Sequence, residues 1–489
     1  MRPPLVVPLA IGGLAAFAAT RFAVSDSDLF WHLGVGRDIA TKGIPAVDSY
    51  SWTVAGRPVL SDQWLGELAL YAAYALAAWR GIELVRALAV GAIAALIVWT
   101  ALAERPRRPL VAVLAAAPAI ALSRFAWTDR PELLGLLCFT VLIALLHAGR
   151  RGDRVAFAWC APLLLVWANL HGSYALGLGL VVAVGIERAV VDRGGRRRYA
   201  ALVAACALAT FVTPAGIATW TSSGGHFLAP PRFVQEEGTP DVTTLPGALF
   251  SLALLATLAV ALLAPSSGRR DTLFALATLV PVLFVSLTAT RHLVFFPIAA
   301  APFLASLGPD AASALWAQVR GAWPQLRSMT PEVRVPGEGT REHGRSPGRR
   351  VGEVVAAEIA AVMFAVALLI AGVTTAPAEP DLSAFPTTAL QQLPAGPGTL
   401  NRYDWGGYLI WYAPATPVFV DGRLFPYVGE ALDDYRAVIG LHADWRQVLA
   451  RRGIRTLLVA PSDAVAVEAQ DLGWPVLMKT SSVVLLRVP

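Results

Sequence analysis

Long apolar runs alternate with short polar segments over the first 375 residues of the chain. Eleven of these runs have, or nearly have, the length with which an α-helix crosses the hydrocarbon core of a bilayer at about 1.5 Å per residue. The predicted transmembrane helices cover residues 4–24, 83–103, 109–123, 131–148, 155–170, 173–190, 199–219, 247–265, 272–290, 292–308 and 353–374. The pattern therefore predicts a mainly α-helical, polytopic membrane protein with about 11 transmembrane helices.

Two apolar stretches need a separate interpretation. The first run resembles a signal peptide, but it is long and only Arg2 precedes it, so we expect an uncleaved first span. The stretch LALYAAYALAAW at 68–79 has only twelve residues and follows a polar segment. A stretch of that length more often lies at the membrane surface or re-enters the membrane than crosses it. We therefore predict a long first outer loop over residues 25–82.

Arginine-rich segments fix the expected orientation. If 68–79 does not span, the segments 104–109, 150–154, 193–198, 266–270 and 320–350 all fall on one side of the membrane. The positive-inside rule places that side in the cytoplasm, together with the amino terminus. Loops 25–82, 123–132, 169–173, 214–246 and 288–292 then lie on the outer face of the cytoplasmic (inner) membrane, as does everything after about residue 375.

The chain divides accordingly into four parts. Residues 1–308 form a multi-span membrane domain, 309–352 an Arg-, Pro- and Gly-rich cytoplasmic linker, and 353–374 the last span. Residues 375–489 change character, because short segments rich in Val, Leu and aromatic residues alternate with helical patterns there. Strands are predicted within 398–412, 416–423, 454–461 and 481–489, and helices over 430–452 and 463–472. This predicts a small extracytoplasmic α/β domain.

Composition supports a membrane protein and excludes several functions. Of the 489 residues, 56% are hydrophobic and 15% are charged, against about a quarter charged in soluble domains. The net charge of +6 comes from arginines in short loops, so we expect a lipid bilayer and no nucleic acid as partner. The three cysteines lie in apolar runs without a CxxC pair, which indicates neither a zinc site nor a disulfide framework. The sequence contains neither a GxGxxG nor a GxxxxGK[ST] motif, so it gives no indication of a nucleotide-binding site.

Acidic residues gather where the first span ends, in the stretch DSDLFWHL at residues 26–33. Ser25, Asp26 or Ser27 can cap a helix over about 28–42, which Gly43 would end. Asp28 and His32 are four residues apart and share a face of that helix. Capping explains these acids, but a partly desolvated carboxylate at the membrane surface can also act as a base. Further acids of the same loop are Asp48, Asp62 and Glu67.

The order of features in this loop resembles that of the GT-C superfamily of polytopic glycosyltransferases. An acid follows span one and precedes a helix, a GIP break, a short aromatic stretch and a second juxtamembrane helix. The resemblance implies that Asp28, or Asp26, is the catalytic acid of the first loop, with His32 as the partner of Asp28. It also implies a second-loop acid, matched by Asp129 or else Glu132. In some members this acid binds a divalent metal ion, the one cofactor that the resemblance suggests.

The resemblance further implies a polyprenyl-phosphate-linked sugar as donor and a lipid, glycan or protein as acceptor, with inversion at the anomeric carbon. Negative charge would build up on the lipid phosphate, so guanidinium groups are expected near it. The cationic candidates on the outer face are Arg124, Arg130, Arg291, His171 and His292. Each of them taken singly is also explained as an ordinary residue at the end of a span.

Two other functions stay open at this point. An O-antigen ligase or polymerase would use residues of loop 214–246, where His226, Arg232, Glu236 and Glu237 lie. A transporter or non-catalytic scaffold would fit the many spans, although no repeated halves are visible. In the tail, Asp404 and Asp421 sit beside Gly406, Gly407 and Gly422. A substrate-binding role is open to these residues, but glycine turns that shape a small core explain them better.

Overall fold

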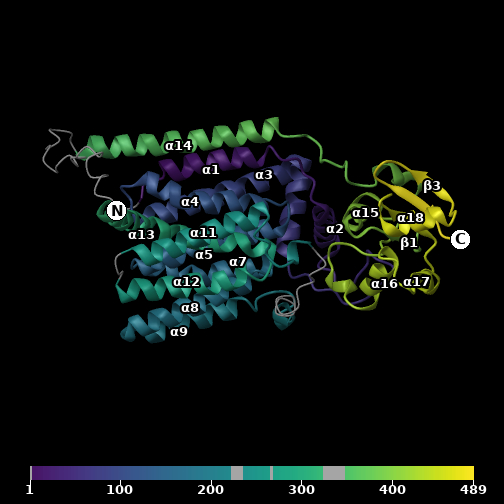
Figure 1. Cartoon of the computed structure of the whole chain (residues 1–489), viewed down its shortest axis with the longest axis horizontal. Coiled ribbons are helices and arrows are strands. Elements are labelled where there is room, and N and C mark those ends of the chain that lie inside the picture. Colours follow the sequence, from purple (N-terminus) through teal and green to yellow (C-terminus); the bar gives the residue numbers. More distant parts are fainter. Residues whose placement is uncertain (1–2, 222–234, 265–267, 323–346) are drawn as a thin grey trace.

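The computed structural model describes residues 3–221, 235–264, 268–322 and 347–489. Long helices lie side by side in a bundle at one end of the molecule, and a small sheet with short helices lies at the other (Figure 1). The bundle consists of α1 (Val6–Ala19), α3 (Trp64–Glu104), α4 (Pro109–Ser123), α5 (Pro131–Arg150), α6 (Arg154–Ala158), α7 (Cys160–Leu170), α8 (Tyr174–Val191), α9 (Arg196–Ala209), α11 (Leu245–Leu263), α12 (Arg269–Ser286), α13 (Phe295–Ala322) and α14 (Pro347–Thr375).

Seven of the described helices are long and apolar enough to cross a membrane, which makes the chain a multi-pass membrane protein. The other four predicted spans correspond to α1, α6 with α7, α9 and α12. Helices α1 and α9 have 14 residues each, and α12 begins with the charged residues Arg269, Arg270 and Asp271. The count of eleven therefore stays a prediction. Helix α13 also continues to Ala322, into the segment predicted as a linker.

A break inside α3 separates the first outer loop from the bundle. Ala77 and Ala78 have non-helical backbone angles, and φ of Ala78 is +50°. A straight helix of 41 residues would measure about 60 Å, twice the hydrocarbon thickness of a bilayer. The break lies within the 68–79 segment that the sequence predicts not to span.

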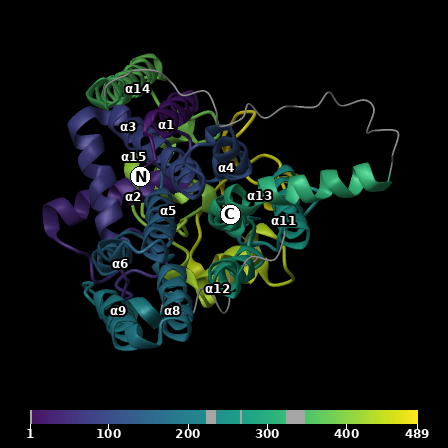
Figure 2. The same ribbon diagram turned by 90° about the vertical axis from the view of Figure 1, so that its left-hand side faces the viewer.

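Ion pairs hold the arginine-rich connections together at one end of the bundle. Arg105 pairs with Asp310 at 2.5 Å, Arg150 with Asp271 at 2.5 Å and Arg151 with Glu104 at 2.6 Å. Figure 2 looks at the molecule from this end and shows α14 and α9 on opposite sides of the bundle. Only 6% of the apolar window of α14 is buried, so this helix lies on the outside of the bundle, against α1.

The tail contains a four-stranded mixed sheet in the order β1-β2-β4-β3. Strand β1 (Thr399–Asn401) runs parallel to β2 (Thr456–Val459), and β4 (Val484–Arg487) runs antiparallel to both β2 and β3 (Val476–Lys479). The accompanying helices are α15 (Gly406–Tyr412), α16 (Glu430–Ile439), α17 (Trp445–Arg452) and α18 (Ala464–Asp471).

Two strand predictions in the tail are wrong in their extent. After Asn401 the segment 398–412 turns into helical structure, because the apolar residues of α15 pack on helix α2 (Ser27–Lys42) instead of in a sheet. Segment 416–423 forms only an isolated bridge from Val418 to Ser51 of the first loop. Strand β3 was not predicted; it has only four residues, of which Val476 and Lys479 are exposed and the middle two are half-buried.

Helix α2 lies between the bundle and the tail, as Figure 1 shows, and packs on both α3 and α15. The Asp26 side chain caps its amino terminus by accepting a hydrogen bond from the backbone of Asp28 at 3.0 Å, and Gly43 ends it. Phe30 packs edge-on against Trp79 of α3 and Tyr408 of α15. The predicted helix over 28–42 is thereby confirmed, and its packing fixes the direction in which the acids at its start point.

Candidate active site

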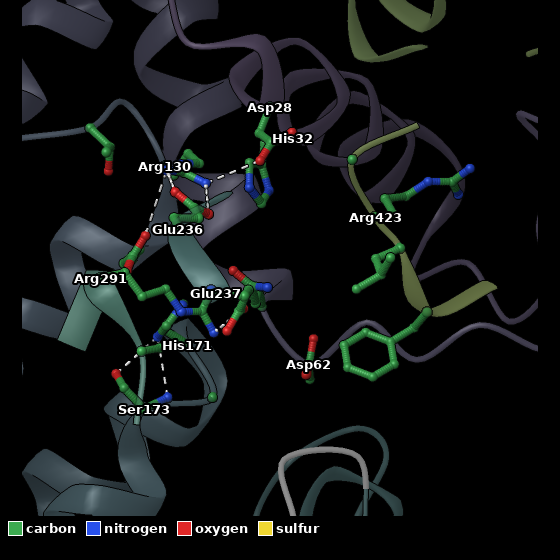
Figure 3. Close-up of a pocket in the computed structure, with 18 of the residues that line it drawn as sticks. Asp28, His32, Asp62, Arg130, His171, Ser173, Glu236, Glu237, Arg291 and Arg423 are labelled. Atoms are coloured by element: carbon green, nitrogen blue, oxygen red, sulfur yellow. Dashed lines mark hydrogen bonds and ion pairs between the residues drawn. The ribbon is translucent and has the colours of Figure 1, made fainter. Parts of the chain in front are cut away.

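A cavity of about 1620 Å³ lies where the first outer loop, the ends of the bundle helices and the tail meet. Its wall combines residues that are far apart in the sequence, several of which Figure 3 shows. The acidic lining residues are Asp26, Asp28, Asp62, Glu67, Glu132, Glu236, Glu237 and Asp404. The basic ones are Arg130, Arg291 and Arg423, together with His32, His171 and His292. Acids therefore outnumber guanidinium groups around this cavity.

Arg130 lies at the centre of the acidic part (Figure 3). Its guanidinium pairs with four carboxylates, two from the start of α2, one from the start of α5 and one from the short 3-10 helix Gln235–Glu237. The distances are 3.0 Å to Asp26, 3.1 Å to Asp28, 3.9 Å to Glu132 and 3.0 Å to Glu236. The Arg130 side chain is only 15% exposed, so this cluster is largely shielded from water. One positive charge facing four carboxylates favours protonation of some of them.

The pKa values in the cluster follow from this crowding. Burial raises the pKa of Asp28 to about 7, against the lowering effect of Arg130. Burial likewise raises the pKa of Asp26. Although burial opposes it, the surrounding carboxylates raise the pKa of Arg130 well above its usual value, so the guanidinium stays charged. Asp28 can therefore exchange a proton near neutral pH, as a general base must.

His32 is not placed as the partner of Asp28 that the sequence analysis expected. Its Nδ1 atom lies 3.5 Å from Glu67, and its ring stacks on Trp31 with the centroids 3.5 Å apart. Burial lowers the pKa of His32 well below its usual value. The partner of Asp28 is instead Arg130, on the second outer loop. Sharing a helix face brings Asp28 and His32 to the same cavity, but packing on α3 directs the imidazole to Glu67.

Cationic and neutral donors gather in another part of the cavity. His171 accepts at Nδ1 from the backbone N–H of Ser173 at 3.2 Å, so its neutral ring carries the proton on Nε2. Burial lowers the pKa of His171 to about 4, which keeps the ring neutral. Arg291 pairs with Glu237 at 2.8 Å, and Nδ1 of His292 is 2.9 Å from the Thr288 hydroxyl. This part therefore presents hydrogen-bond donors to an anion.

Apolar side chains line the remainder of the cavity. They come from several bundle helices and from the 3-10 helix η4 (Thr290–Val294). The main ones are Leu122, Phe125, Leu176, Pro281, Phe284 and Leu293. Two of them, Phe125 at 44% and Phe284 at 63% exposure, lie open to the surroundings of the bundle. A ligand with a polar head and an apolar chain matches this division of the wall.

Three predicted residues lie away from the cavity. Asp129 forms a buried ion pair with Arg86 at 2.7 Å, which leaves Glu132 as the second-loop acid in the cavity wall. Arg124 is exposed and stacks over Phe22 at 4.6 Å. Asp48 is buried and pairs with Arg423 at 2.7 Å. Sequence spacing alone gave no way to distinguish Asp129 from Glu132, since which side each faces depends on how α5 packs on α3.

Other residues at the cavity were not predicted as site residues of a glycosyltransferase. Glu236 and Glu237 belong to outer loop 214–246, and Arg423 follows the Asp421-Gly422 turn of the tail. His226 and Arg232, on which the ligase hypothesis depends, lie outside the described residues. The sequence had indicated Glu236 and Glu237 only for the ligase hypothesis, as charged residues of loop 214–246.

The resemblance suggested a divalent metal ion as one cofactor, with Asp129 as a candidate ligand. That carboxylate binds Arg86 instead, and the four acids nearest Asp28 surround a guanidinium. Within residues 3–221, 235–264, 268–322 and 347–489, no group of three or more His, Cys, Asp or Glu residues has the arrangement of a metal site. The described residues therefore do not fit a metal ion as they stand.

Comparisons with known proteins agree with this architecture. No protein-family profile and no curated protein matches the sequence. The oligosaccharyltransferase of Archaeoglobus fulgidus in its apo form is similar, with a TM-score of 0.59 at 12% identity over 93% of this chain and 69% of that one. ArnT from Cupriavidus metallidurans bound to undecaprenyl phosphate has a TM-score of 0.52 at 15% identity, over 99% and 97% of the two chains. Both are GT-C glycosyltransferases, so the chain has the GT-C fold that its first loop predicted.

Proposed function

We propose that this protein is a membrane glycosyltransferase that moves a sugar from a polyprenyl-phosphate donor to a lipid, glycan or protein acceptor. The observation that carries the proposal is the composition of one cavity. A carboxyl group that titrates near neutrality, a group of anion-binding donors and an apolar wall all border it. The solved structures of similar fold support the donor class, since one binds a dolichol-phosphate and another undecaprenyl phosphate. We place the cavity at the outer face of the cytoplasmic membrane, because the arginine-rich loops lie at the opposite end of the bundle and such loops favour the cytoplasmic side.

In the proposed reaction Asp28 acts as the general base. Its carboxylate takes the proton of the acceptor hydroxyl while that oxygen bonds to the anomeric carbon of the donor. The bond from the anomeric carbon to the phosphate oxygen breaks at the same centre, and its electron pair leaves with the polyprenyl phosphate. A single displacement inverts the anomeric configuration. Arg130 orients the Asp28 carboxylate through their contact at 3.1 Å.

The leaving phosphate requires positive charge and hydrogen-bond donors. We assign this role to Arg291, His171 and His292, which border the cavity together. Neutral His171 can donate from Nε2 without the cost of burying a second charge. The expected role of Arg130 as a phosphate ligand becomes secondary in this proposal, because its guanidinium already faces four carboxylates.

The pH dependence of transfer tests the assignment of Asp28. Since the base must be ionised, activity should rise with pH through the pKa of about 7. The rate at pH 6 should be roughly one-fifth of that at pH 7, and the profile should level off above pH 8. Initial rates of transfer from a labelled polyprenyl-phosphate sugar to membrane acceptors, measured between pH 5.5 and 8.5, provide the profile. A rate that stays constant across this range would contradict a base that titrates there.

A substitution at Asp129 should affect stability and not chemistry. In Asp129→Asn the Arg86 guanidinium loses its charged partner but keeps the Phe22 carbonyl that accepts from it. We expect a loss of about 3 kcal/mol in the free energy of unfolding, because both side chains of this pair are only 3% exposed. Transfer per folded molecule should stay within about threefold of the wild type, because a group remote from the reacting atoms contributes little to the barrier. Thermal melting and transfer rates on the same preparation check both parts; lost transfer with an unchanged melting temperature would restore Asp129 to the site.

A further inference from the structure

A segment of the tail, Val418–Tyr427, lies directly on the first outer loop. The backbone N–H of Trp52 donates to the Val418 carbonyl at 3.1 Å, and the N–H of Val418 donates to the Tyr50 carbonyl at 3.0 Å. The Thr53 hydroxyl donates to the Phe419 carbonyl at 2.6 Å. These bonds fix the register of the tail segment against the loop that carries the acids.

A buried ionic cluster strengthens the same contact. Arg423 pairs with Asp48 of the first loop at 2.7 Å and with Asp421 of its own turn at 2.6 Å. The Tyr427 hydroxyl also donates to Asp421, and the Arg423 guanidinium lies 4.8 Å from the ring centroid of Tyr50. The side chains of both aspartates are fully buried. Buried charges of this kind persist only when each has its partner, so the two chain segments can be expected to stay together.

Gly422 lies inside this turn, against the carboxylate of Asp28. A Cβ atom added at Gly422 would be 1.9 Å from Oδ1 of Asp28 and 2.9 Å from Nε1 of Trp31. Two residues later Leu424 has φ of +54°, a conformation that L residues other than Asn and Asp rarely adopt. Such strain persists where surrounding contacts over-determine the backbone, and it is often found at functional sites.

We infer that the Asp421-Gly422-Arg423 turn of the tail is a positioning element that holds the Asp28 carboxylate against Arg130. The turn closes the space on the side of Asp28 away from the second outer loop. Asp28 then lies between the Gly422 backbone and the Arg130 guanidinium, and Arg423 and Asp48 fix the backbone of that turn. Gly422 and Arg423 act through Asp28 and need not touch the donor. This inference rests on the proposed function only for the consequence that it has for transfer.

The sharpest probe is Gly422→Ala. The atoms nearest to the new methyl group all belong to side chains, so the fold can accept the substitution if the Asp28 carboxylate moves and the Trp31 indole shifts slightly. A displacement of this size should lower kcat about 10- to 100-fold and change KM for the donor little. Arg130 lowers the pKa of Asp28, so moving the carboxylate away from it should shift the acid limb of the pH profile of activity to higher pH. A general loss of folded protein would not shift this limb. Gly308→Ala is the matched control, because no atom lies within 4 Å of its added Cβ.

Asp48→Asn provides a second variant that does not crowd the cavity. It removes the charged partner of Arg423 and should loosen the turn, with a shift of the acid limb in the same direction. Glu468→Gln is its control, since Glu468 forms an exposed pair with Arg446 at 3.5 Å on the surface of the tail. An activity profile of Asp48→Asn that equals that of the wild type would contradict the role of the ionic cluster.

Labelling of Asp28 separates this inference from the proposed function. Carbodiimide coupling of an amine modifies a protonated carboxyl group, and peptide mass spectrometry of the full-length protein measures it across pH without any turnover. We expect the labelling of Asp28 to extend to higher pH in Gly422→Ala than in the wild type and Gly308→Ala. Identical Asp28 profiles in all three proteins would overturn the inference, whatever the transfer assay gives. Absence of transfer in the wild type would instead count against the proposed function alone.

Discussion

Asp28→Asn is expected to lower kcat for sugar transfer by about 10²- to 10⁴-fold, the contribution typical of a general base. Asparagine has nearly the same shape and keeps an acceptor oxygen toward Arg130, but it cannot take the proton of an acceptor hydroxyl. The neighbouring acids should not replace it, because Asp26 is occupied as the helix cap and in the pair with Arg130. Donor binding should change little, since the anion-binding donors and the apolar wall lie elsewhere in the cavity.

Initial rates over a range of donor concentrations, beside thermal melting of the same preparation, separate kcat from KM and from folding. The matched variant is Asp62→Asn, which removes another carboxyl group from the same loop and the same cavity. We expect a much smaller effect there, because Asp62 is not among the carboxylates that surround Arg130. Equal rates for Asp28→Asn and the wild type would remove Asp28 from the mechanism.

Arg130→Gln is expected to have the largest effect on stability. The substitution leaves Asp26, Asp28, Glu132 and Glu236 close together in a largely shielded place without their shared cation. Removing one partner of a buried ionic network costs about 3–5 kcal/mol. We therefore expect a clear fall in the melting temperature at pH 8. Arg124→Gln is the control, because Arg124 lies on the same loop but is exposed and stacks on Phe22.

The stability that Arg130→Gln loses should be larger at pH 8 than at pH 5. Without the guanidinium, the pKa values of the clustered carboxyl groups rise above their values in the unfolded chain. Such groups favour the folded state when protonated, so the variant should be less unstable at pH 5 than at pH 8. Adding Glu236→Gln should restore part of the stability at pH 8 by removing one negative charge. A melting temperature that differs from the wild type by the same amount at both pH values would contradict this account of the cluster.

Much of the fold was predictable from the sequence because membrane spans leave a strong local signal. A helix that crosses the bilayer needs a long apolar run, and each predicted span overlaps a described helix, although α9 covers only the first half of 199–219. The two ends of helix α2 were also predictable, because helix caps depend on residues close in sequence. Asp26 was one of three candidate caps, and Gly43 was the expected last position. The tail was harder. Segment 406–412 has the aromatic content of a strand but folds as α15, because its partner is helix α2, which is more than 350 residues away in the sequence.

The site was predictable in its location but not in its pairings. The sequence led us to expect acids of the first loop and basic residues of later loops in one cavity; Asp28, Arg130 and Arg291 line such a cavity, whereas Asp129 and Arg124 do not. It could not tell that Asp129 turns to Arg86, or that His32 turns to Glu67, because these choices depend on side-chain packing between helices. The contact of Gly422 with Asp28 joins residues almost 400 positions apart. No local sequence pattern could have predicted it.

Sugar transfer by the purified protein is the most direct test of the whole account. The full chain, reconstituted in liposomes, is supplied with a panel of labelled polyprenyl-phosphate sugars and an extract of membrane acceptors, beside the Asp28→Asn variant. The account predicts that the wild type releases polyprenyl phosphate and moves label to an acceptor with at least one donor, and that the variant does so at least about 100-fold more slowly. Equal rates of label transfer by the wild type and the variant would contradict it. So would the absence of transfer by the wild type with every donor of the panel.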